Sequence, residues 1–457
     1  MNHWNFERSW QLNSKNSTEM DAYRRAIKAL DRRGFGIRPG LDRVRALLEL
    51  LDDPQKSYPS IHVAGTNGKT TTSRIIGALL AAHGCSVGTY TSPHLQSVRE
   101  RFERLGSAEE GIVADLIEPE EFALLHEYLG PFIATIENER GETVTYFEVL
   151  TAMAFDWMAQ QAVGAGVFET GLGGRWDATN VLEPQVCVLT NIDVDHAIFL
   201  GSTPVENARE KAGIIKPGTV VVSAQQDPEV DPVITEAALR EGAELHRMQD
   251  SFEILSDDVA EGGRITTVRG LHSTYEDLFL PLMGQHQSRN LAVSIAAVEA
   301  FFGRQLDPEA TRAALLQVRS PGRMEIVRLH PVVMLDGAHN PDGAATLAGA
   351  IKTSFPGRHT TLVLSIMSDK DREGILERIL PLADSVIFTR CEGPRASDPR
   401  DLASIASKLG HASSVVPSLR EAIDAAIDQS GHEDLVLMTG SLYAVGEARD
   451  HLVGPIE

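Results

Sequence analysis

The chain has 457 residues, of which 42% are hydrophobic and 23% charged. This length predicts two or three domains, and this composition is sufficient for ordinary packed cores. The formal net charge is -22, which argues against general nucleic-acid binding because that function requires a basic surface. Anionic small substrates remain compatible with this charge, since a few local basic side chains or metal ions can outweigh a distant acidic surface.

The three cysteines, Cys85, Cys187 and Cys391, are far apart and form neither a CxxC pair nor a zinc-ligand spacing. They indicate reduced thiols in a cytoplasmic protein. Residues 1–16 are polar, lack the apolar core of a signal peptide and predict a flexible tail. No apolar run approaches the roughly 20 residues that a membrane helix requires. We therefore expect a cytoplasmic protein without a membrane segment.

The first two thirds of the chain alternate between short apolar strands and helical segments. Met20 to Leu51 has helical spacing on either side of a glycine-rich segment at residues 34–40, which predicts two helices around a loop. A helix is predicted at Thr71–His83. The predicted strands are Ser60–Ala64, Val87–Thr91, Gly166–Glu169, Val186–Asn191 and Val220–Ser223. Continuously apolar strands in this alternation predict a parallel sheet covered by helices on both faces.

The remainder predicts an inserted antiparallel element and a second domain. Short alternating pieces at Gly263–Val268 and Glu276–Leu282 predict the antiparallel element, and a helix is predicted at Ser288–Phe302. Arg319–Arg323 contains Ser-Pro-Gly and predicts a linker. Further predicted strands are Val332–Asp336, Thr361–Ile366, Ser385–Thr389 and Leu435–Thr439. We expect an α/β protein with a P-loop-containing parallel-sheet ATPase domain at residues 17–320 and a smaller Rossmann-like domain at residues 322–457.

A glycine-rich sequence lies between the first predicted strand and the first predicted helix beyond it. Its glycines let the backbone turn tightly and present N–H groups to phosphate oxygens, and the helix N-terminus adds a favourable partial charge. Lys69 can reach the terminal phosphates, and the hydroxyl of Thr70 or Thr71 can contact Mg²⁺. The spacing is shorter than the general GxxxxGK[ST] pattern, but the strand–loop–helix context predicts phosphate binding. The loop comprises Gly65, Thr66, Asn67, Gly68, Lys69 and Thr70.

Three possible metal ligands follow apolar strands. Ser92, Glu169 and His196 come at or just beyond the ends of three predicted strands. In a parallel sheet these ends share one edge, where ligands bind. A hydroxyl, a carboxylate and an imidazole there could complete the shell of a Mg²⁺ near nucleotide phosphates. Singly, each residue also suits a structural role as a helix cap, a surface carboxylate or a hydrogen-bonding histidine, so the prediction rests on their joint position.

These motifs resemble the Mur ligase superfamily, and within it the folylpolyglutamate synthase/dihydrofolate synthase family. The resemblance extends over nearly the whole chain, from Gly40 to Tyr443. The Gly-Thr-Asn-Gly-Lys loop belongs to the whole superfamily, whereas Ser92-Pro93-His94-Leu95 and Gly171-Leu172-Gly173-Gly174-Arg175 are specific to the folate branch. Further matching pieces are Glu100-Arg101-Phe102, Glu210–Pro217, Pro321-Gly322-Arg323 and Asp336–Asn340.

The resemblance implies the catalytic and metal-binding residues. Lys69, Glu169, His196 and Lys211 would be catalytic, with Thr70 and Ser92 joining the last three as metal ligands. Lys211 would be carbamylated by CO₂ and would bind a second Mg²⁺. An unmodified lysine, with a pKa of about 10.4, is cationic and would repel the metal, whereas a carbamate is anionic. Thr203-Pro204-Val205-Glu206 predicts a capped helix start that fixes the position of Lys211, which otherwise suits a solvated helix surface.

The resemblance also implies the substrate contacts. Asn290 would contact adenine, Arg323 the phosphates, and Asp336 and His339 the ribose and phosphates of ATP. An aromatic side chain beside a carboxylate suits a flat pterin with N–H donors, although Phe147 also suits a core position. Arg38 and Arg43 are further folate-side candidates. The implied folate contacts are Thr145, Tyr146, Phe147, Glu148, Trp176, Asp177 and Ala178.

The implied reaction is the ATP-dependent ligation of L-glutamate to a folate, to dihydropteroate or to both. ATP would phosphorylate the substrate carboxylate, and the glutamate amine would attack the acyl phosphate. The implied partners are small molecules only, and a monomer is expected. The preferred pterin stays open, because Thr70-Thr71-Thr72, Thr170 and Trp176 depart from the residues usual in the family.

Three other functions are weighed against this one. A Mur ligase acting on a peptidoglycan precursor usually carries an extra N-terminal domain, for which the position of Gly65 leaves little room. A P-loop ATPase or GTPase acting as a switch or motor does not account for Lys211 or for the second domain. A nucleotide-binding scaffold has no need of two metals.

Overall fold

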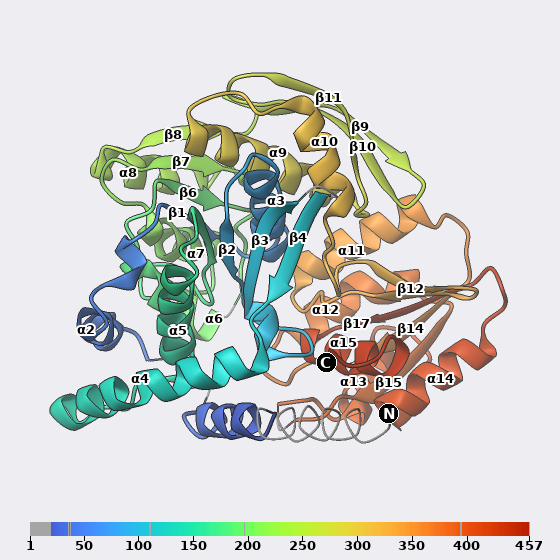
Figure 1. The fold of residues 1–457 in the computed structure, drawn as a ribbon. Coiled ribbons are helices and arrows are strands. Elements are labelled where there is room, and N and C mark those ends of the chain that lie inside the picture. The colour runs from blue at the N-terminus through green and yellow to red at the C-terminus, as the bar shows by residue number, and fades with distance from the viewer. Residues whose placement is uncertain are drawn as a thin grey trace, which may run out of the picture.

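The computed structural model describes residues 20–34, 36, 38–108, 111–195, 197–393 and 395–456. The tail predicted at residues 1–16 lies outside them. Two α/β domains lie side by side (Figure 1). The N-terminal domain contains an eight-stranded sheet in the order β4-β3-β2-β5-β1-β6-β7-β8. Its strands are β1 (Ser60–Ala64), β2 (Val87–Tyr90), β3 (Phe102–Ala108), β4 (Gly111–Leu116), β5 (Ala165–Glu169), β6 (Val186–Leu189), β7 (Val220–Ser223) and β8 (Glu244–Arg247).

Six strands of this sheet, from β2 to β8 in spatial order, are parallel. Five of them are predicted from the sequence, whereas β8, at the far edge, is not. β3 and β4 add an antiparallel hairpin at the edge, which the sequence analysis misses. Two predicted strands end early, β2 at Tyr90 and β6 at Leu189. Consequently Thr91 and Asn191 already belong to the loops beyond the carboxyl edge.

Helices cover both faces of this sheet. α3 (Lys69–Ala82) and α9 (Gln285–Phe302) pack on one face. The other face carries α2 (Asp42–Leu50), α4 (Pro119–Arg140) and α5 (Tyr146–Gln160). α3 begins at Lys69 rather than at the predicted Thr71, because Gly68 at φ 88° turns the chain directly into the helix. The helix predicted from Ser288 likewise begins three residues earlier, at Gln285.

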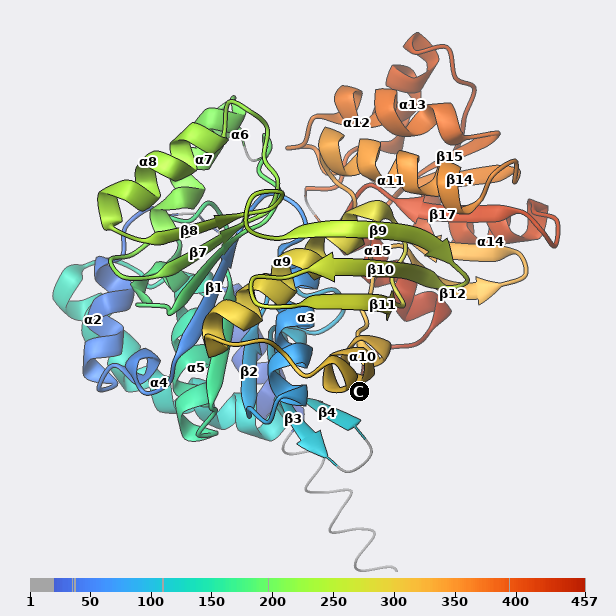
Figure 2. The same cartoon turned by 90° about the horizontal axis from the view of Figure 1, so that it is seen from above.

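The predicted antiparallel element is a three-stranded sheet that lies over α9 (Figure 2). Its strands are β9 (Glu253–Ala260), β10 (Gly263–Arg269) and β11 (Thr274–Leu280). The side chains of Tyr275, Leu278 and Leu280 complete the apolar core on the α3–α9 face. This sheet therefore buries the outer surface of α9 and fixes the helix that carries Asn290.

The C-terminal domain has a six-stranded sheet in the order β12-β13-β17-β14-β15-β16, parallel except for β12. One face carries α11 (Pro341–Ser354), α12 (Arg372–Ile379) and α13 (Pro399–Lys408), and the other carries α14 (Leu419–Gln429) and α15 (Leu442–Leu452). This is the predicted Rossmann-like architecture. Its strands are β12 (Glu325–Leu329), β13 (Val332–Leu335), β14 (Thr360–Leu364), β15 (Ser385–Arg390), β16 (Ser414–Ser418) and β17 (Leu435–Thr439).

Two predictions from composition can be compared with the structure directly. Cys85, Cys187 and Cys391 are all free thiols, as expected. Among the described helices, none combines the length and the apolar character that crossing a membrane would require.

Candidate active site

One cavity of about 860 Å³ lies between the two domains. It is lined by the phosphate loop, by segments that follow β2, β5 and β6, and by loops at the carboxyl edge of the C-terminal sheet. The site residues predicted from the sequence line this cavity, apart from Arg43, which pairs with Glu148, and His196, which lies outside the described residues. The strand ends therefore bring together in one cavity the residues predicted to contact nucleotide, metal and folate.

The phosphate loop is held in shape by its own backbone and by the end of β6. The Thr66 N–H donates to the Asn191 carbonyl at 2.7 Å, and the Thr66 hydroxyl donates to the Asp193 carbonyl at 2.7 Å. At Gly65, φ is 154° and a Cβ would collide with the Thr190 hydroxyl, so only glycine fits. The Lys69 ammonium donates to the carbonyls of Gly65 and Thr66, at 3.1 Å each. The loop therefore holds one positive charge, the Lys69 ammonium, against its own backbone carbonyl groups.

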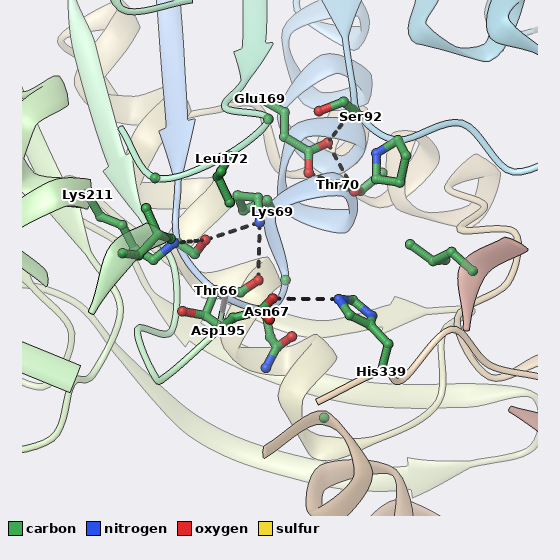
Figure 3. A pocket seen from close by; sticks show the side chains of 18 of the residues that line it. Thr66, Asn67, Lys69, Thr70, Ser92, Glu169, Leu172, Asp195, Lys211 and His339 are labelled. Atoms are coloured by element: carbon green, nitrogen blue, oxygen red, sulfur yellow. Dashed lines mark hydrogen bonds and ion pairs between the residues drawn. The ribbon is translucent and has the colours of Figure 1, made fainter. Parts of the chain in front are cut away.

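Thr70, Ser92 and Glu169 form a compact group beside this loop (Figure 3). The Thr70 hydroxyl lies 3.0 Å from each Glu169 carboxylate oxygen, and the Ser92 N–H donates to Oε2 at 3.2 Å. The neighbouring Thr71 hydroxyl instead contacts the Ser320 hydroxyl at 3.0 Å. Of the two threonines considered from the sequence, Thr70 therefore faces the carboxylate, and Thr71 faces the linker to the second domain.

This group fits a Mg²⁺ ion. The Ser92 hydroxyl oxygen is buried and has no hydrogen-bond partner within the described part of the chain. Burial raises the pKa of the Glu169 carboxyl, while the Lys69 charge lowers it. A buried carboxylate with two hydroxyl oxygens beside it is a hard oxygen donor set, which Mg²⁺ prefers. A cation there would provide the orphaned hydroxyl with a partner and would neutralise the buried carboxylate.

Lys211 is the last residue of α7 (Pro204–Lys211) and is 3% exposed. The predicted capping box is present, with Thr203 and Glu206 bonded reciprocally. The glycine-rich loop at residues 171–174, which follows β5, packs against this end of α7. A Cβ at Gly174 would lie 2.7 Å from the Glu210 carbonyl oxygen and 2.8 Å from that of Lys211, which explains the glycine. Burial, followed by the charge of Lys69, lowers the pKa of Lys211 to about 7. Lys211 is therefore a buried amine and not a solvated helix lysine.

The predicted nucleotide contacts come from both domains. Asn290 on α9 lies against Gly68, where a Cβ would be 2.6 Å from its Oδ1 atom. Asp336 follows β13, and its carboxylate accepts the N–H groups of Met324 and Ala338 at 2.9 and 2.8 Å. It therefore fixes the backbone on the C-terminal side of Arg323. His339 is held by a 2.8 Å contact between its Nδ1 and the Gly337 carbonyl.

Two carboxylates on the predicted folate side are already engaged within the protein. Glu148 is buried, accepts the Thr145 N–H at 2.8 Å in the capping box of α5, and pairs with Arg43 at 3.0 Å. The buried Asp177 accepts the N–H groups of Leu172 and Thr179 at 2.8 and 3.0 Å and the Thr179 hydroxyl at 2.5 Å. Both residues line the cavity, but these contacts hold the protein backbone that forms its wall.

Aromatic side chains on this side are better placed to contact a substrate. Phe147 is partly buried, and its ring packs against Gly171, where a Cβ would be 2.5 Å from Cζ. Trp176 and Phe199 both line the cavity although they are 53% and 55% exposed. Tyr146 and Ala178 are mostly buried beside them. The sequence analysis did not single out Phe199, which follows β6 in a helix of four residues with no motif of its own.

Contacts between the domains reveal further residues that the sequence analysis missed. The Lys370 ammonium pairs with the Asp195 carboxylate at 2.7 Å, and the side chain of each is 11% exposed. His339 approaches the same carboxylate at 3.6 Å (Figure 3). Asp342 accepts hydrogen bonds from Asn67 and Asn191 at 2.7 and 3.1 Å. The only sequence signal is that Asp195 and Lys370 follow strands of their respective sheets, β6 and β14.

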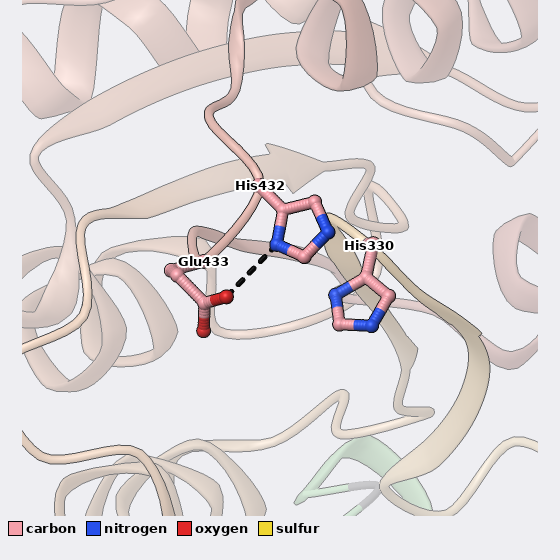
Figure 4. Close-up of side chains that lie close together, drawn as sticks. All are labelled: His330, His432 and Glu433. Atoms are coloured by element: carbon pink, nitrogen blue, oxygen red, sulfur yellow. Dashed lines mark hydrogen bonds and ion pairs between the residues drawn. The ribbon is translucent and has the colours of Figure 1, made fainter.

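A second group of possible metal ligands, His330, His432 and Glu433, lies outside the cavity (Figure 4). The two imidazole rings are stacked, with centroids 3.9 Å apart and planes 16° apart. Each ring binds a metal through an in-plane nitrogen lone pair, so rings stacked in this way do not converge on one ion. Glu433 also lies 3.7 Å from Arg358, a cation. We therefore assign no metal to this group, which packs the β12–β13 turn against the loop before β17.

The fold and the site together define a class: a two-domain, nucleotide-dependent ligase of the Mur type. Residues 322–442 match the family described as Mur ligase, glutamate ligase domain. A dihydrofolate synthase/folylpolyglutamate synthase of Mycobacterium tuberculosis is 40% identical over 445 residues, 90% of each chain. Its Bacillus subtilis counterpart is 36% identical over 92% of this chain and 96% of its own.

A solved structure extends the similarity to three dimensions. The folylpolyglutamate synthase of Mycobacterium tuberculosis complexed with ADP superimposes with a TM-score of 0.88 at 39% identity, covering 94% of this chain and 98% of that one. The chain therefore belongs to the dihydrofolate synthase/folylpolyglutamate synthase family.

Proposed function

We propose that this chain joins L-glutamate to both dihydropteroate and a reduced folate, with ATP, in the cavity between its two domains. ATP-dependent ligation of glutamate to a folate is the function of the family to which it belongs. One observation supports its assignment to this cavity. The phosphate loop, the Thr70–Ser92–Glu169 group, Lys211 and the aromatic side chains all line it. A Mur ligase acting on a peptidoglycan precursor and a P-loop ATPase without ligase chemistry are not favoured.

Mg²⁺ is the metal that we propose for this site, held by Glu169, Ser92 and Thr70 together with His196. When bound, Mg²⁺ neutralises charge on the phosphates and on the phosphoryl group in transfer. The nearby Lys69 supplies a further positive charge at the phosphate loop. Electrostatic stabilisation of this kind is usually the largest contribution to phosphoryl transfer.

We further propose that Lys211 is carbamylated and completes a second Mg²⁺ site. The neutral amine attacks CO₂, a nitrogen–carbon bond forms while one carbon–oxygen π bond breaks, and one proton leaves to solvent, so the neutral amine becomes an anionic carbamate. Two properties of Lys211 support this modification. Its lowered pKa, about 7, leaves much of the amine neutral near physiological pH, and its full burial penalises the charged form.

In the proposed reaction, Asn290, Arg323 and His339 position the nucleotide, and Phe147 and Trp176 flank the pterin. The terminal phosphoryl group of ATP passes to the acceptor carboxylate. The amine of glutamate then attacks the acyl phosphate, phosphate leaves and an amide forms. No protein nucleophile is needed, so the side chains act by binding, orientation and exclusion of water.

We propose that residues 17–320 and 322–457 move as two units about a hinge at Ser320–Gly322. Three features support a hinge there. The Ser320 hydroxyl contacts Thr71, Gly322 has φ 68°, and the C-terminal sheet starts at Glu325. Structures with and without nucleotide that superimpose over the whole chain would exclude it. We also propose a cytoplasmic monomer, a location consistent with three free cysteines.

The proposed function is tested by incubating pure enzyme with ATP, Mg²⁺ and glutamate, with dihydropteroate in one reaction and tetrahydrofolate in another. Mass spectrometry then detects addition of one glutamyl unit. Product in both reactions establishes the bifunctional ligase, and product in one restricts the acceptor. ATP hydrolysis without product in either reaction overturns the folate assignment.

A further inference from the structure

Arg101 differs from the other buried arginines of the chain. Four arginines are buried among the described residues: Arg43, Arg99, Arg101 and Arg264. Three of them form an ion pair with a glutamate or aspartate. Within the described part of the chain, Arg101 forms none, although acidic residues outnumber basic ones by 64 to 42 in the sequence. A buried charge without a counter-charge is costly, so it requires an explanation.

The contacts that Arg101 does make leave its charge uncompensated. Its Nε donates to the Nδ1 of His94 at 3.0 Å, and its guanidinium lies 5.8 Å from the ring centre of Tyr146. Because the Nδ1 of His94 accepts this hydrogen bond, it carries a lone pair, so the imidazole is neutral in this arrangement. Both contacts orient the guanidinium and neither brings a negative charge.

The adjacent Glu100 does not pair with Arg101 but binds backbone N–H groups. Its carboxylate accepts the backbone N–H groups of Leu95, Gln96 and Ser97, at 2.7 to 2.9 Å. These bonds cap the short helix η2 (Val98–Arg101). The loop is therefore built so that its acid stabilises the turn while the side chain of Arg101, 6% exposed, lines the cavity.

The position of Arg101 assigns it to the acceptor side of the cavity. Its carbonyl accepts the Thr91 N–H at 3.2 Å, which places it beside the segment that leads to Ser92. Its charge acts on Tyr90 and on Tyr146, the first residue of α5. On the phosphate side, the cations acting on Glu169 are Lys69 and Arg323. Arg101 is therefore a separate positive centre, displaced from the phosphate loop towards the folate-side residues.

We propose that Arg101 binds the α-carboxylate of a glutamyl residue in the substrate. The planar guanidinium can hold a carboxylate with two parallel hydrogen bonds, and pairing would compensate its buried charge. The proposal rests on the proposed ligase function. Two substrates carry this group, the incoming L-glutamate and the glutamyl tail of a folate. Dihydropteroate lacks it, since its single carboxylate is the one that reacts.

The test compares Arg101→Gln and Arg101→Lys with the wild-type enzyme. KM values are measured for ATP, for glutamate with each acceptor, and for tetrahydrofolate and dihydropteroate. Arg101→Gln is expected to raise one KM by about 10- to 100-fold, the range for a charged hydrogen bond, and Arg101→Lys by less. If Arg101 binds the folate tail, the KM for tetrahydrofolate rises and the KM for dihydropteroate does not change. If incoming glutamate is bound, its KM rises with both acceptors.

Arg99→Gln is the matched control. Arg99 lies two residues away, is equally buried and pairs with Glu118, but it does not line the cavity. This control should lower the thermal midpoint and leave the KM values unchanged. The proposal is overturned if Arg101→Gln keeps the wild-type KM values for glutamate and tetrahydrofolate. It is also overturned if the KM rises equally for every substrate, ATP included. If Arg101→Gln fails to fold, Arg101→Lys decides by the same criteria. Absence of product from the wild-type enzyme instead refutes the ligase function itself.

Discussion

The Nζ atom of Lys211 lies 2.8 Å from the carbonyl oxygen of Gly65, the first residue of the phosphate loop. This contact joins the end of α7 to the nucleotide site through a fully buried side chain. Because both burial and Lys69 lower the pKa of the amine, to about 7, its neutral form is well populated at physiological pH. This geometry supports the proposed carbamylation of Lys211.

Replacing Lys211 by Met should abolish ligation while preserving the fold. The Met side chain fills the same apolar space but cannot carry a carbamate, and we expect a loss of about 100-fold or more in kcat. Lys216→Met is the control, because Lys216 is partly buried on the same segment but does not line the cavity. With carbon-13 bicarbonate, a carbamate NMR signal should persist in Lys216→Met and disappear in Lys211→Met. Activity close to wild type in Lys211→Met would refute the carbamate.

Glu169→Gln should remove the stabilisation of the protein by Mg²⁺. In the wild type, Mg²⁺ at about 100 times its Kd should add about 2.7 kcal/mol to the free energy of unfolding. The variant loses the anionic ligand, and without metal it should be at least as stable at neutral pH because a buried charge is gone. Asp156→Asn is the control, since Asp156 is buried outside the cavity and burial also raises its pKa. An equal Mg²⁺-dependent rise in thermal midpoint in Glu169→Gln would exclude Glu169 as a ligand.

His62 should make stability depend on pH below neutrality. Its Nε2 lies 2.8 Å from the Thr179 hydroxyl, and burial lowers its pKa to about 3. Between pH 6.5 and about 3 the unfolded chain binds a proton that the folded chain does not, so stability falls as pH falls through this window. One such group contributes up to about 1.4 kcal/mol per pH unit. Urea unfolding of His62→Gln should show a shallower pH dependence than the wild type. Parallel curves would contradict this assignment.

The backbone architecture is largely predictable from the sequence because it follows from local patterns. Apolar runs such as Val186–Leu189 predict buried parallel strands, and the glycine-rich loop before Lys69 predicts a phosphate site. The hairpin β3–β4 is missed because only some of its residues are buried, and Glu103 and Asp115 interrupt the apolar pattern. β4 is the edge strand and β3 lies next to it, where burial imposes the weakest sequence signal.

Side-chain function is less predictable because it depends on which lone pairs remain available after packing. Glu148 and Asp177 occupy the expected place, yet capping and loop contacts use their oxygens. Arg43 pairs with Glu148 instead of facing a substrate. The pair Asp195–Lys370 joins residues 175 positions apart, across two domains, and no local pattern encodes such a contact. His196 lies outside the described residues, and its role as a ligand stays a prediction.

The Asp195–Lys370 pair should control closure of the two domains. Removing one partner of a buried ion pair costs about 3–5 kcal/mol, and here the cost falls on the closed arrangement because the partners belong to different domains. Lys370→Met should therefore increase the radius of gyration measured by X-ray scattering with nucleotide present, and lower kcat/KM by about 10-fold or more. Lys370→Arg, which keeps the charge, should have a radius of gyration and a kcat/KM closer to the wild-type values. Lys352→Met, an exposed change on α11, is the control. A closed shape with wild-type kcat/KM in Lys370→Met would show that the pair does not hold the domains together.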